Sequence, residues 1–207
     1  MQTQAKKYLT PEEYLANERV AEYKSEYFAG EVFALAGASE RHNIVALNIA
    51  SELRSQLKGR PCRSYMSDMR VSVAQDDLYT YPDVVVVCGQ PIFHDNSRDV
   101  LVNPTVVIEV LSESTEAYDR GGKFEHYRRI ESLREYVLVA QDRHRVEHYL
   151  RLDDGHWLFS EIAGLEGTLA LSSIECELPM TEIYHKVDLS GASGQVPEGA
   201  PGDIPSL

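Results

Sequence analysis

Hydrophobic side chains recur every four positions within residues 38–57, at Val45, Ile49, Leu53 and Leu57. This spacing places them on one face of a helix, and the polar residues between them fall on the opposite face. Because Ser39 suits the start of a helix and Gly59 its end, the pattern predicts one long helix here.

The residues before this helix predict a shorter helix and a hairpin. Thr10, Pro11 and Glu13 form a capping box with proline in the first turn, which starts a helix that runs to about residue 17. Residues 27–35 contain two apolar runs separated by Gly30-Glu31, a pattern typical of two strands joined by a turn.

Extended segments follow the long helix. Residues 62–74 are predicted to be extended, a second strand covers residues 83–88, and a third covers residues 105–111 after a loop over residues 89–103. The last two strands are almost entirely apolar. This favours central strands that are buried on both faces of a sheet.

The second half of the chain predicts a helix over residues 118–130, two strands at 135–140 and 145–152, and a further strand pair at 157–162 and 168–171. This order predicts a mixed sheet flanked by helices, in the α/β class with α+β as the borderline alternative. One domain is expected over residues 1–188. The acidic residues 189–207, rich in Gly, Ser and Pro, predict a disordered tail.

Composition narrows the class of protein. Hydrophobic residues make up 43% of the chain and charged residues 26%, as in globular domains. No apolar run approaches the roughly 20 residues of a membrane helix, and no secretory signal is recognisable, so we expect a cytoplasmic protein that binds no membrane. The three cysteines show no CxxC spacing, which predicts reduced thiols rather than a zinc site or a disulfide framework.

The net charge of −13 argues against tight, non-specific binding to DNA. Residues 152–207 hold ten acidic residues and one basic residue, so most of the acidity is C-terminal. Residues 1–151 carry only −4, and binding to nucleic acid stays open for that part of the chain.

Two acidic residues lie where burial is costly. Asp83 begins one apolar strand and Glu109 lies inside another, and a buried carboxylate needs a partner or a metal ion. Lys123 follows on the next predicted helix. The alternative interpretations are a strand cap for Asp83, a buried salt bridge for Glu109 and a solvated helix residue for Lys123.

Six stretches of the chain extend this pattern. They are AGEVFALAGASERHN (29–43), SDMRV (67–71), YPDVVVVC (81–88), PTVVIEVLSEST (104–115), YDRGGKFEHYR (118–128) and LREYVLVAQDRHRVEHY (133–149). In this order and spacing they resemble the Uma2 family, also called DUF820, over residues 8–187. The resemblance implies the restriction-endonuclease-like fold of the PD-(D/E)XK type and an endonuclease activity, with DNA the expected nucleic acid.

The resemblance also implies roles for particular residues. Asp83 matches the first acid of the motif and Glu109 the second, and the two are expected to bind Mg²⁺ or Mn²⁺ together with the backbone carbonyl of Val110. Lys123 matches the catalytic lysine, which in this family lies on the following helix, while Leu111 stands in the usual lysine position. Other residues in matching motifs are possible accessory groups: Glu31, His42, Asp68, Asp119 and Tyr127.

Other functions stay open. A binding module that keeps the nuclease fold without catalysis, a metal-dependent hydrolase of small phosphate esters, and a purely structural partner are the alternatives. A homodimer is expected from the resemblance to nucleases that cut two strands. The chain contains no GxSxG, Walker, GxGxxG or HExxH motif, and we expect His144 and His148 to be surface residues.

Overall fold

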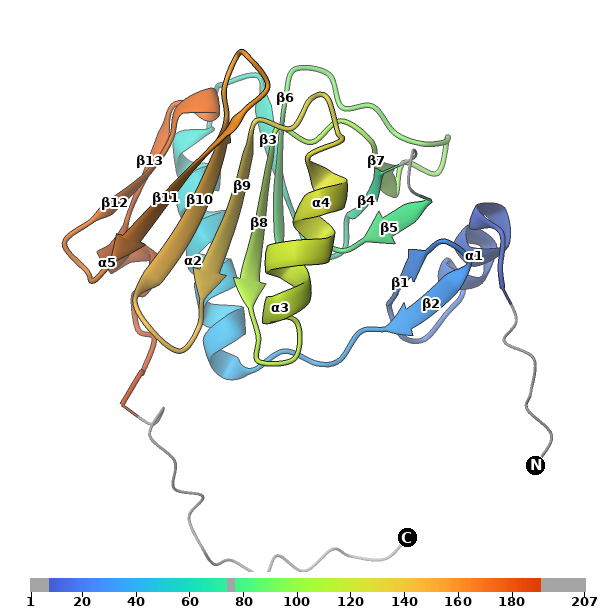
Figure 1. The fold of residues 1–207 in the computed structure, drawn as a ribbon, viewed down its shortest axis with the longest axis horizontal. Coiled ribbons are helices and arrows are strands. Elements are labelled where there is room, and N and C mark those ends of the chain that lie inside the picture. The colour runs from blue at the N-terminus through green and yellow to red at the C-terminus, as the bar shows by residue number, and fades with distance from the viewer. Residues whose placement is uncertain (1–7, 74–76, 191–207) are drawn as a thin grey trace, which may run out of the picture.

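The computed structural model describes residues 8–73 and 77–190, so most of the predicted tail lies outside the described residues (Figure 1). Within the described ranges the strands form a six-stranded, a five-stranded and a two-stranded sheet. The predicted mixed sheet flanked by helices is therefore confirmed. None of the helices in these ranges is long and apolar enough to cross a membrane.

The six-stranded sheet is the centre of the molecule, in the order β11-β10-β9-β8-β6-β3. Its strands are β3 (Cys62–Met66), β6 (Val84–Cys88), β8 (Val106–Leu111), β9 (Glu135–Ala140), β10 (Arg145–Arg151) and β11 (Trp157–Ala163). Only β8 and β9 run parallel, and the other neighbours are antiparallel. The predicted central strands β6 and β8 lie side by side inside this sheet.

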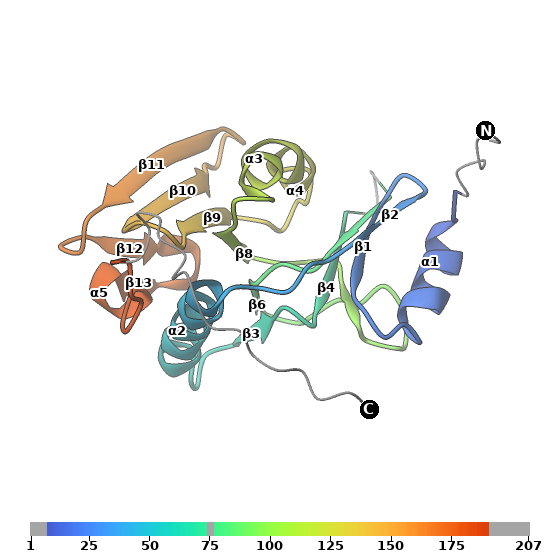
Figure 2. The same cartoon turned by 90° about the horizontal axis from the view of Figure 1, so that it is seen from below.

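Helices cover both faces of this sheet, as was predicted from the apolar sequences of its central strands. Helix α2 (Glu40–Gln56) lies on one face, and α3 (Glu116–Tyr118) and α4 (Phe124–Tyr127) lie on the other (Figure 2). Side chains of β6 alternate between the two cores, because successive residues of a strand point to opposite faces. Val84 packs in the core with α2, and Val85 packs in the core with α4.

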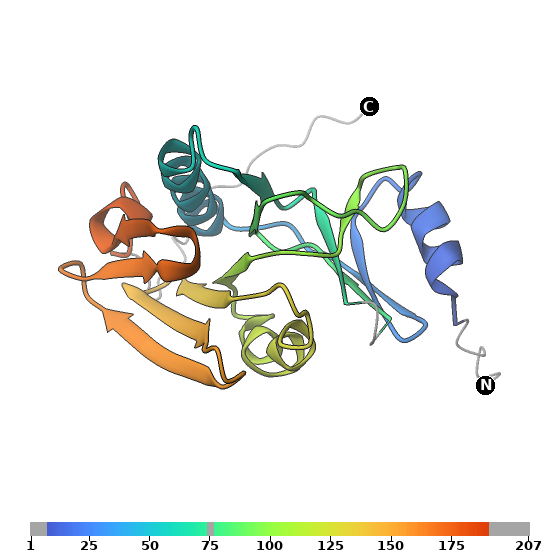
Figure 3. The ribbon, with the colours of Figure 1, turned by 90° about the horizontal axis from the view of Figure 1, so that it is seen from above.

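The five-stranded sheet forms a second layer to one side of the first, with α1 (Pro11–Glu18) against it (Figure 3). Its order is β2-β1-β5-β4-β7. The strands are β1 (Ser25–Phe28), β2 (Glu31–Ala34), β4 (Arg70–Val73), β5 (Leu78–Thr80) and β7 (Val100–Leu101). The predicted capping box of α1 and the predicted hairpin are both confirmed. Ala29 and Gly30 form the hairpin turn with positive φ angles.

Strand pairing departs from the prediction in two places. The segment predicted to be extended forms two strands in different sheets, β3 and β4, with residue 74 outside the described residues, and the short strands β5 and β7 were not predicted. The predicted pair at 157–162 and 168–171 is wrong, since β11 pairs with β10 and β12 (Thr168–Leu171) pairs with β13 (Cys176–Pro179). The alternation of apolar and polar residues along a strand shows which of its faces is buried. It does not show which strand lies next to it.

Two further segments complete the chain. The 3₁₀ turn Ser172–Ile174 connects β12 to β13, and α5 (Met180–Ile183) follows β13 against α2. The predicted helix over residues 118–130 is instead three short pieces, α3, a π-helical turn at Asp119–Lys123 and α4. We call the middle piece the π turn. It contains Gly121-Gly122, and glycine weakens regular helix.

The expectation that His148 is a surface residue is wrong. Its side chain is buried, and its Nε2 atom lies 2.5 Å from Oε2 of the fully buried Glu135. The other oxygen of Glu135 accepts a hydrogen bond from the Ser173 backbone at 2.7 Å. The 3₁₀ turn thus covers the start of β9, where Glu135 lies. The hydrophobic pattern of β10 alone did not show this cover over His148. His144 is half-buried, with its ring against Tyr184.

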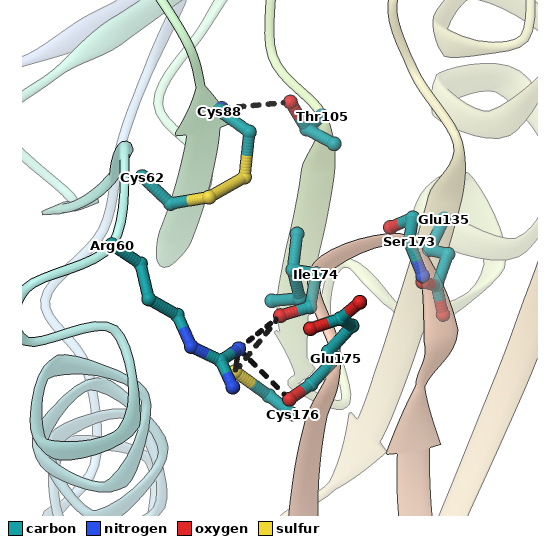
Figure 4. The surroundings of a disulfide bond; sticks show 9 residues. All are labelled: Arg60, Cys62, Cys88, Thr105, Glu135, Ser173, Ile174, Glu175 and Cys176. Carbon is teal, nitrogen blue, oxygen red and sulfur yellow. Dashed lines mark hydrogen bonds between the residues drawn. A yellow bond between two sulfur atoms is a disulfide. The ribbon is translucent and has the colours of Figure 1, made fainter.

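The prediction of three reduced thiols is also wrong. Cys62 and Cys88 are directly opposite each other on the antiparallel strands β3 and β6 and form a disulfide (Figure 4). Cys176 is a free, buried thiol. The two bonded residues are 26 positions apart, and no sequence spacing signals such a cross-strand pair. Disulfides are rare in reducing compartments such as the cytoplasm. The Cys62–Cys88 bond therefore gives no support to the cytoplasmic location, which stays a prediction.

Reduction of this disulfide should lower the free energy of unfolding by about 3 kcal/mol, because the unfolded chain regains the freedom of the closed loop. Urea unfolding with and without dithiothreitol measures the difference. A Cys62→Ser/Cys88→Ser variant should match the reduced protein and ignore the reductant. Equal midpoints for the oxidised and reduced protein would contradict the expectation.

Candidate active site

The antiparallel pairing of β6 and β8 brings two carboxylates together. Val84 is opposite Ile108 in this pairing, so Asp83, just before β6, lies beside Glu109. The backbone N–H of Asp83 donates to Oε2 of Glu109 at 3.4 Å, and the N–H of Val110 donates to Oδ2 of Asp83 at 2.7 Å. Both carboxylates line a cavity of about 800 Å³.

Lys123 reaches the same place from the π turn. Its Nζ atom lies 3.1 Å from Glu26 Oε1, 3.3 Å from Glu109 Oε1 and 3.3 Å from Asp119 Oδ1. The lysine is only 6% exposed. Burial by itself lowers the pKa of Lys123, but the three carboxylates outweigh it and hold that pKa well above its usual value. Lys123 is therefore a stable ammonium group in a buried acidic cluster.

Contacts with the central sheet fix the π turn that carries Lys123. The Arg120 guanidinium grips the buried carboxylate of Glu147 on β10, with Nε at 3.1 and 3.0 Å from its two oxygens and Nη2 at 2.8 Å from one of them. The hydroxyl of Tyr136 on β9 donates to the backbone carbonyl of Asp119 at 3.0 Å. These charge-assisted and buried bonds hold the turn in one place.

Glu109 is a deeply buried acid of the cluster, at 4% exposure. Its Oε1 atom also accepts a hydrogen bond from the Tyr127 hydroxyl at 3.2 Å, and that hydroxyl lies 2.7 Å from Thr80 Oγ1. Burial raises the pKa of Glu109 well above its usual value, Lys123 opposes the rise, and the carboxylates of Asp119 and Asp83 add to it. The cluster thus favours a proton on this carboxyl group.

His42, near the start of α2, contacts the other acid. Its Nε2 atom lies 3.2 Å from Asp83 Oδ2. Burial lowers the pKa of His42, but the Asp83 carboxylate and a hydrogen bond to the Val110 backbone outweigh burial and raise it overall. His42 therefore contacts Asp83 and the Val110 backbone, the two groups that were expected to bind a metal ion together with Glu109.

The structure brings together most of the residues that the sequence singled out. Asp83, Glu109, Lys123, His42 and Asp119 line one cavity, and Tyr127 contacts Glu109 from behind it. Two predicted accessory residues lie elsewhere. Glu31 on β2 does not line the cavity, and neither does Asp68, whose side chain is 90% exposed and ion-paired with Lys24.

Sequence reasoning missed Glu26. This residue lies on β1, is buried, and contacts Lys123 and the Tyr81 backbone N–H, which donates to it at 3.2 Å. The signal was the same as for Glu109, an acid beside apolar residues in a strand. It was overlooked because β1 begins at Ser25, two residues before the predicted hairpin.

The residues present fit a hard divalent cation. The lining of the cavity holds five carboxylates, from Glu26, Asp83, Glu109, Glu113 and Asp119, and two lysines, so the cavity has a surplus of negative charge. In residues 8–73 and 77–190 no group of three or more His, Cys, Asp or Glu side chains is arranged to hold a metal ion by itself. Magnesium suits such a site, since it takes one or two carboxylates and keeps several waters.

Comparison with known proteins gives a consistent result. The model of the Uma2 family, described as "Putative restriction endonuclease", matches residues 11–181. The uncharacterized proteins sll1609 and slr1290 of Synechocystis sp. are 40% and 36% identical to this chain. The first alignment covers 80% of this chain and 94% of the relative, and the second covers 85% and 91%.

A solved structure shows the same fold. The crystal structure of a "putative nuclease belonging to DUF820" from Anabaena variabilis superposes with a TM-score of 0.71 at 18% identity. The match covers 85% of this chain and 97% of that chain. The central sheet, the paired carboxylates and the family match together lead to one conclusion: the chain belongs to the Uma2 family and has its nuclease-type fold.

Proposed function

We propose that this protein is a Mg²⁺- or Mn²⁺-dependent endonuclease that hydrolyses phosphodiester bonds of nucleic acid, with DNA as the expected substrate. The observation that carries the proposal is the convergence of two strand-borne carboxylates, Asp83 and Glu109, with the Lys123 ammonium on one cavity. The match to a family described as "Putative restriction endonuclease" supports a nuclease in general.

Each residue has a distinct task in this proposal. Asp83 and Glu109 would hold the cation, with the Val110 carbonyl as a further oxygen ligand. The bound cation supplies Lewis-acid activation of water and neutralises phosphate charge. Lys123 is a fixed positive charge, so it orients the attacking water and stabilises negative charge on the phosphate, and it does not act as a base. Glu26 and Asp119 keep that ammonium charged and in place.

The proposal extends to assembly and location. One cavity of this kind serves one scissile phosphate, so a homodimer would be needed to cut both strands of a duplex at once. We also propose that the protein acts in the cytoplasm. Sedimentation at micromolar concentration, with and without duplex DNA, tests the homodimer, and a monomer in both conditions would refute it.

The acidic surroundings of the site favour one alternative, a binding module that has kept the fold without catalysis. The two hypotheses differ in metal binding. An endonuclease of this type should bind Mn²⁺ in the millimolar range or tighter with one ion per site, as calorimetry would show.

A small-molecule phosphatase would cleave nucleotides and leave single-stranded and duplex DNA intact.

Asp83→Asn and Glu109→Gln should each lower the rate of Mg²⁺-dependent DNA cleavage by about a hundredfold or more, because each removes a charge that holds the cation. Lys123→Met should lose cleavage to a similar extent but still bind Mn²⁺. Cleavage of a labelled oligonucleotide and calorimetric Mn²⁺ titration provide the two measurements.

Asp68→Asn is the matched control for these variants, since it removes an acid outside the cavity and should cleave like the wild type. Circular dichroism verifies that every variant is folded. Full cleavage by a folded Asp83→Asn/Glu109→Gln double variant would overturn the assignment of the site.

The proton held by Glu109 should also appear in the stability of the metal-free protein. The pKa of Glu109 is higher in the folded than in the unfolded state. Its contribution to stability is thus complete at low pH and is lost as pH rises from the unfolded pKa, near 4.5, through the raised folded pKa. One such group contributes a slope of up to about 1.4 kcal/mol per pH unit.

Glu109→Gln should remove this slope, because the amide does not titrate. Urea unfolding in EDTA at a series of pH values above 4.5 would compare the variant with the wild type. Identical pH dependence in the two proteins would show that Glu109 is ionised in the metal-free cluster, contrary to the expectation.

A further inference from the structure

The ring of Tyr118 lies directly on the backbone of Gly122. A Cβ atom at position 122 would come within 2.7 Å of ring atom Cε2 and 2.8 Å of ring atom Cδ2. Carbon atoms do not pack this closely, so only glycine leaves the ring in its observed place. A Cβ atom at the neighbouring Gly121 would meet nothing within 4 Å. The two adjacent glycines therefore have different steric surroundings.

This placement brings the Tyr118 ring to the buried ammonium of the site. The Nζ atom of Lys123 is 5.8 Å from the ring centroid, within the range of a cation–π contact. Tyr118 is 39% exposed and Lys123 is 6% exposed, so part of the tyrosine meets solvent while its ring lies beside the buried ammonium. Burial and then the negative charge of Glu26 raise the pKa of Tyr118, consistent with this position beside the cluster.

The π turn creates this arrangement. Its wider winding brings residues five apart, such as Tyr118 and Lys123, closer to one face than an α-helix does. Arg120 and Glu147 anchor the turn to the sheet, as described above, but neither contacts the Lys123 ammonium. Within the described residues, the Lys123 ammonium forms ion pairs with the carboxylates of the cluster. The ring found over it is that of Tyr118.

We propose that Tyr118, seated on Gly122, is a positioning residue that covers the Lys123 ammonium and keeps it in contact with the carboxylates of the site. The role in catalysis rests on the endonuclease function proposed above. The role in placing Lys123 does not depend on that function, so the two can be tested separately.

The physical reason is the mobility of an uncovered lysine. An ammonium on a four-carbon stem is strongly hydrated and gains many rotamers once water reaches it. A ring over one side of the group excludes water from that side and adds a favourable cation–π contact. Loss of the ring should therefore reduce the fraction of molecules with Lys123 in place, while the carboxylates Asp83 and Glu109 still bind metal and substrate.

The test compares four variants of the full chain. Tyr118→Ala removes the ring, and Gly122→Ala displaces it by steric conflict. Tyr118→Phe keeps the ring face, and Gly121→Ala adds the same methyl group where there is room for it. The first readout is the rate at which acetic anhydride modifies Lys123, measured by peptide mass spectrometry in EDTA with the exposed Lys58 as internal reference.

Lys123 should be modified about tenfold faster in Tyr118→Ala and Gly122→Ala than in the wild type, and at the wild-type rate in Tyr118→Phe and Gly121→Ala. The Tyr118→Ala/Gly122→Ala double variant should match Tyr118→Ala alone, because both changes remove the same contact. Thermal unfolding verifies folding. If Gly122→Ala does not fold, Tyr118→Ala against Tyr118→Phe provides the same comparison.

The second readout is DNA cleavage. The variants with fast modification should lose kcat about tenfold with little change in KM, and Tyr118→Phe should restore it. Equal modification of Lys123 in all variants would overturn the proposal, whatever the cleavage results. Absence of cleavage by the wild type, with the modification pattern as expected, would refute the endonuclease function and leave the positioning role intact.

Discussion

The buried ammonium of Lys123 is the group on which the arrangement of the site depends. It lies within ion-pair distance of Glu26, Glu109 and Asp119, which come from strands of the two larger sheets and from the π turn. Without a positive charge at this point, several buried carboxylates would face one another uncompensated. Removing one partner of a buried ion pair typically costs about 3–5 kcal/mol, so the ammonium supports the contact between the two sheets by compensating acids from both.

The same charge balance explains how a structural cluster can also be a reaction site. Three carboxylates against the one ammonium of Lys123 leave negative charge uncompensated, and the cluster meets this by favouring a proton on Glu109. A divalent cation would satisfy the same need, with Asp83 beside it on the neighbouring strand. The ion pair that ties β1 to the π turn and the ion pair at the proposed cation site thus share the Lys123 ammonium.

The sequence predicted the long helix, the capped first helix and the two central strands, because their signals are local. Partners for Asp83 and Glu109 could also be anticipated, since an acid in an apolar strand needs a partner. The neighbour of each strand could not, and this is why the Cys62–Cys88 disulfide and the β12–β13 pair were missed. Glu26 escaped notice because β1 begins two residues before the predicted hairpin, so its local signal, an acid in a strand, was not recognised.

We propose that Asp83 and Glu109 bind one hard cation next to Lys123. A crystal soaked in Mn²⁺ and measured at the manganese absorption edge would locate that cation. We expect a single strong anomalous peak in contact with an oxygen of each carboxylate, with the Lys123 ammonium still facing the cavity. A soaked crystal with no peak between the two carboxylates, or with manganese bound only elsewhere, would contradict it.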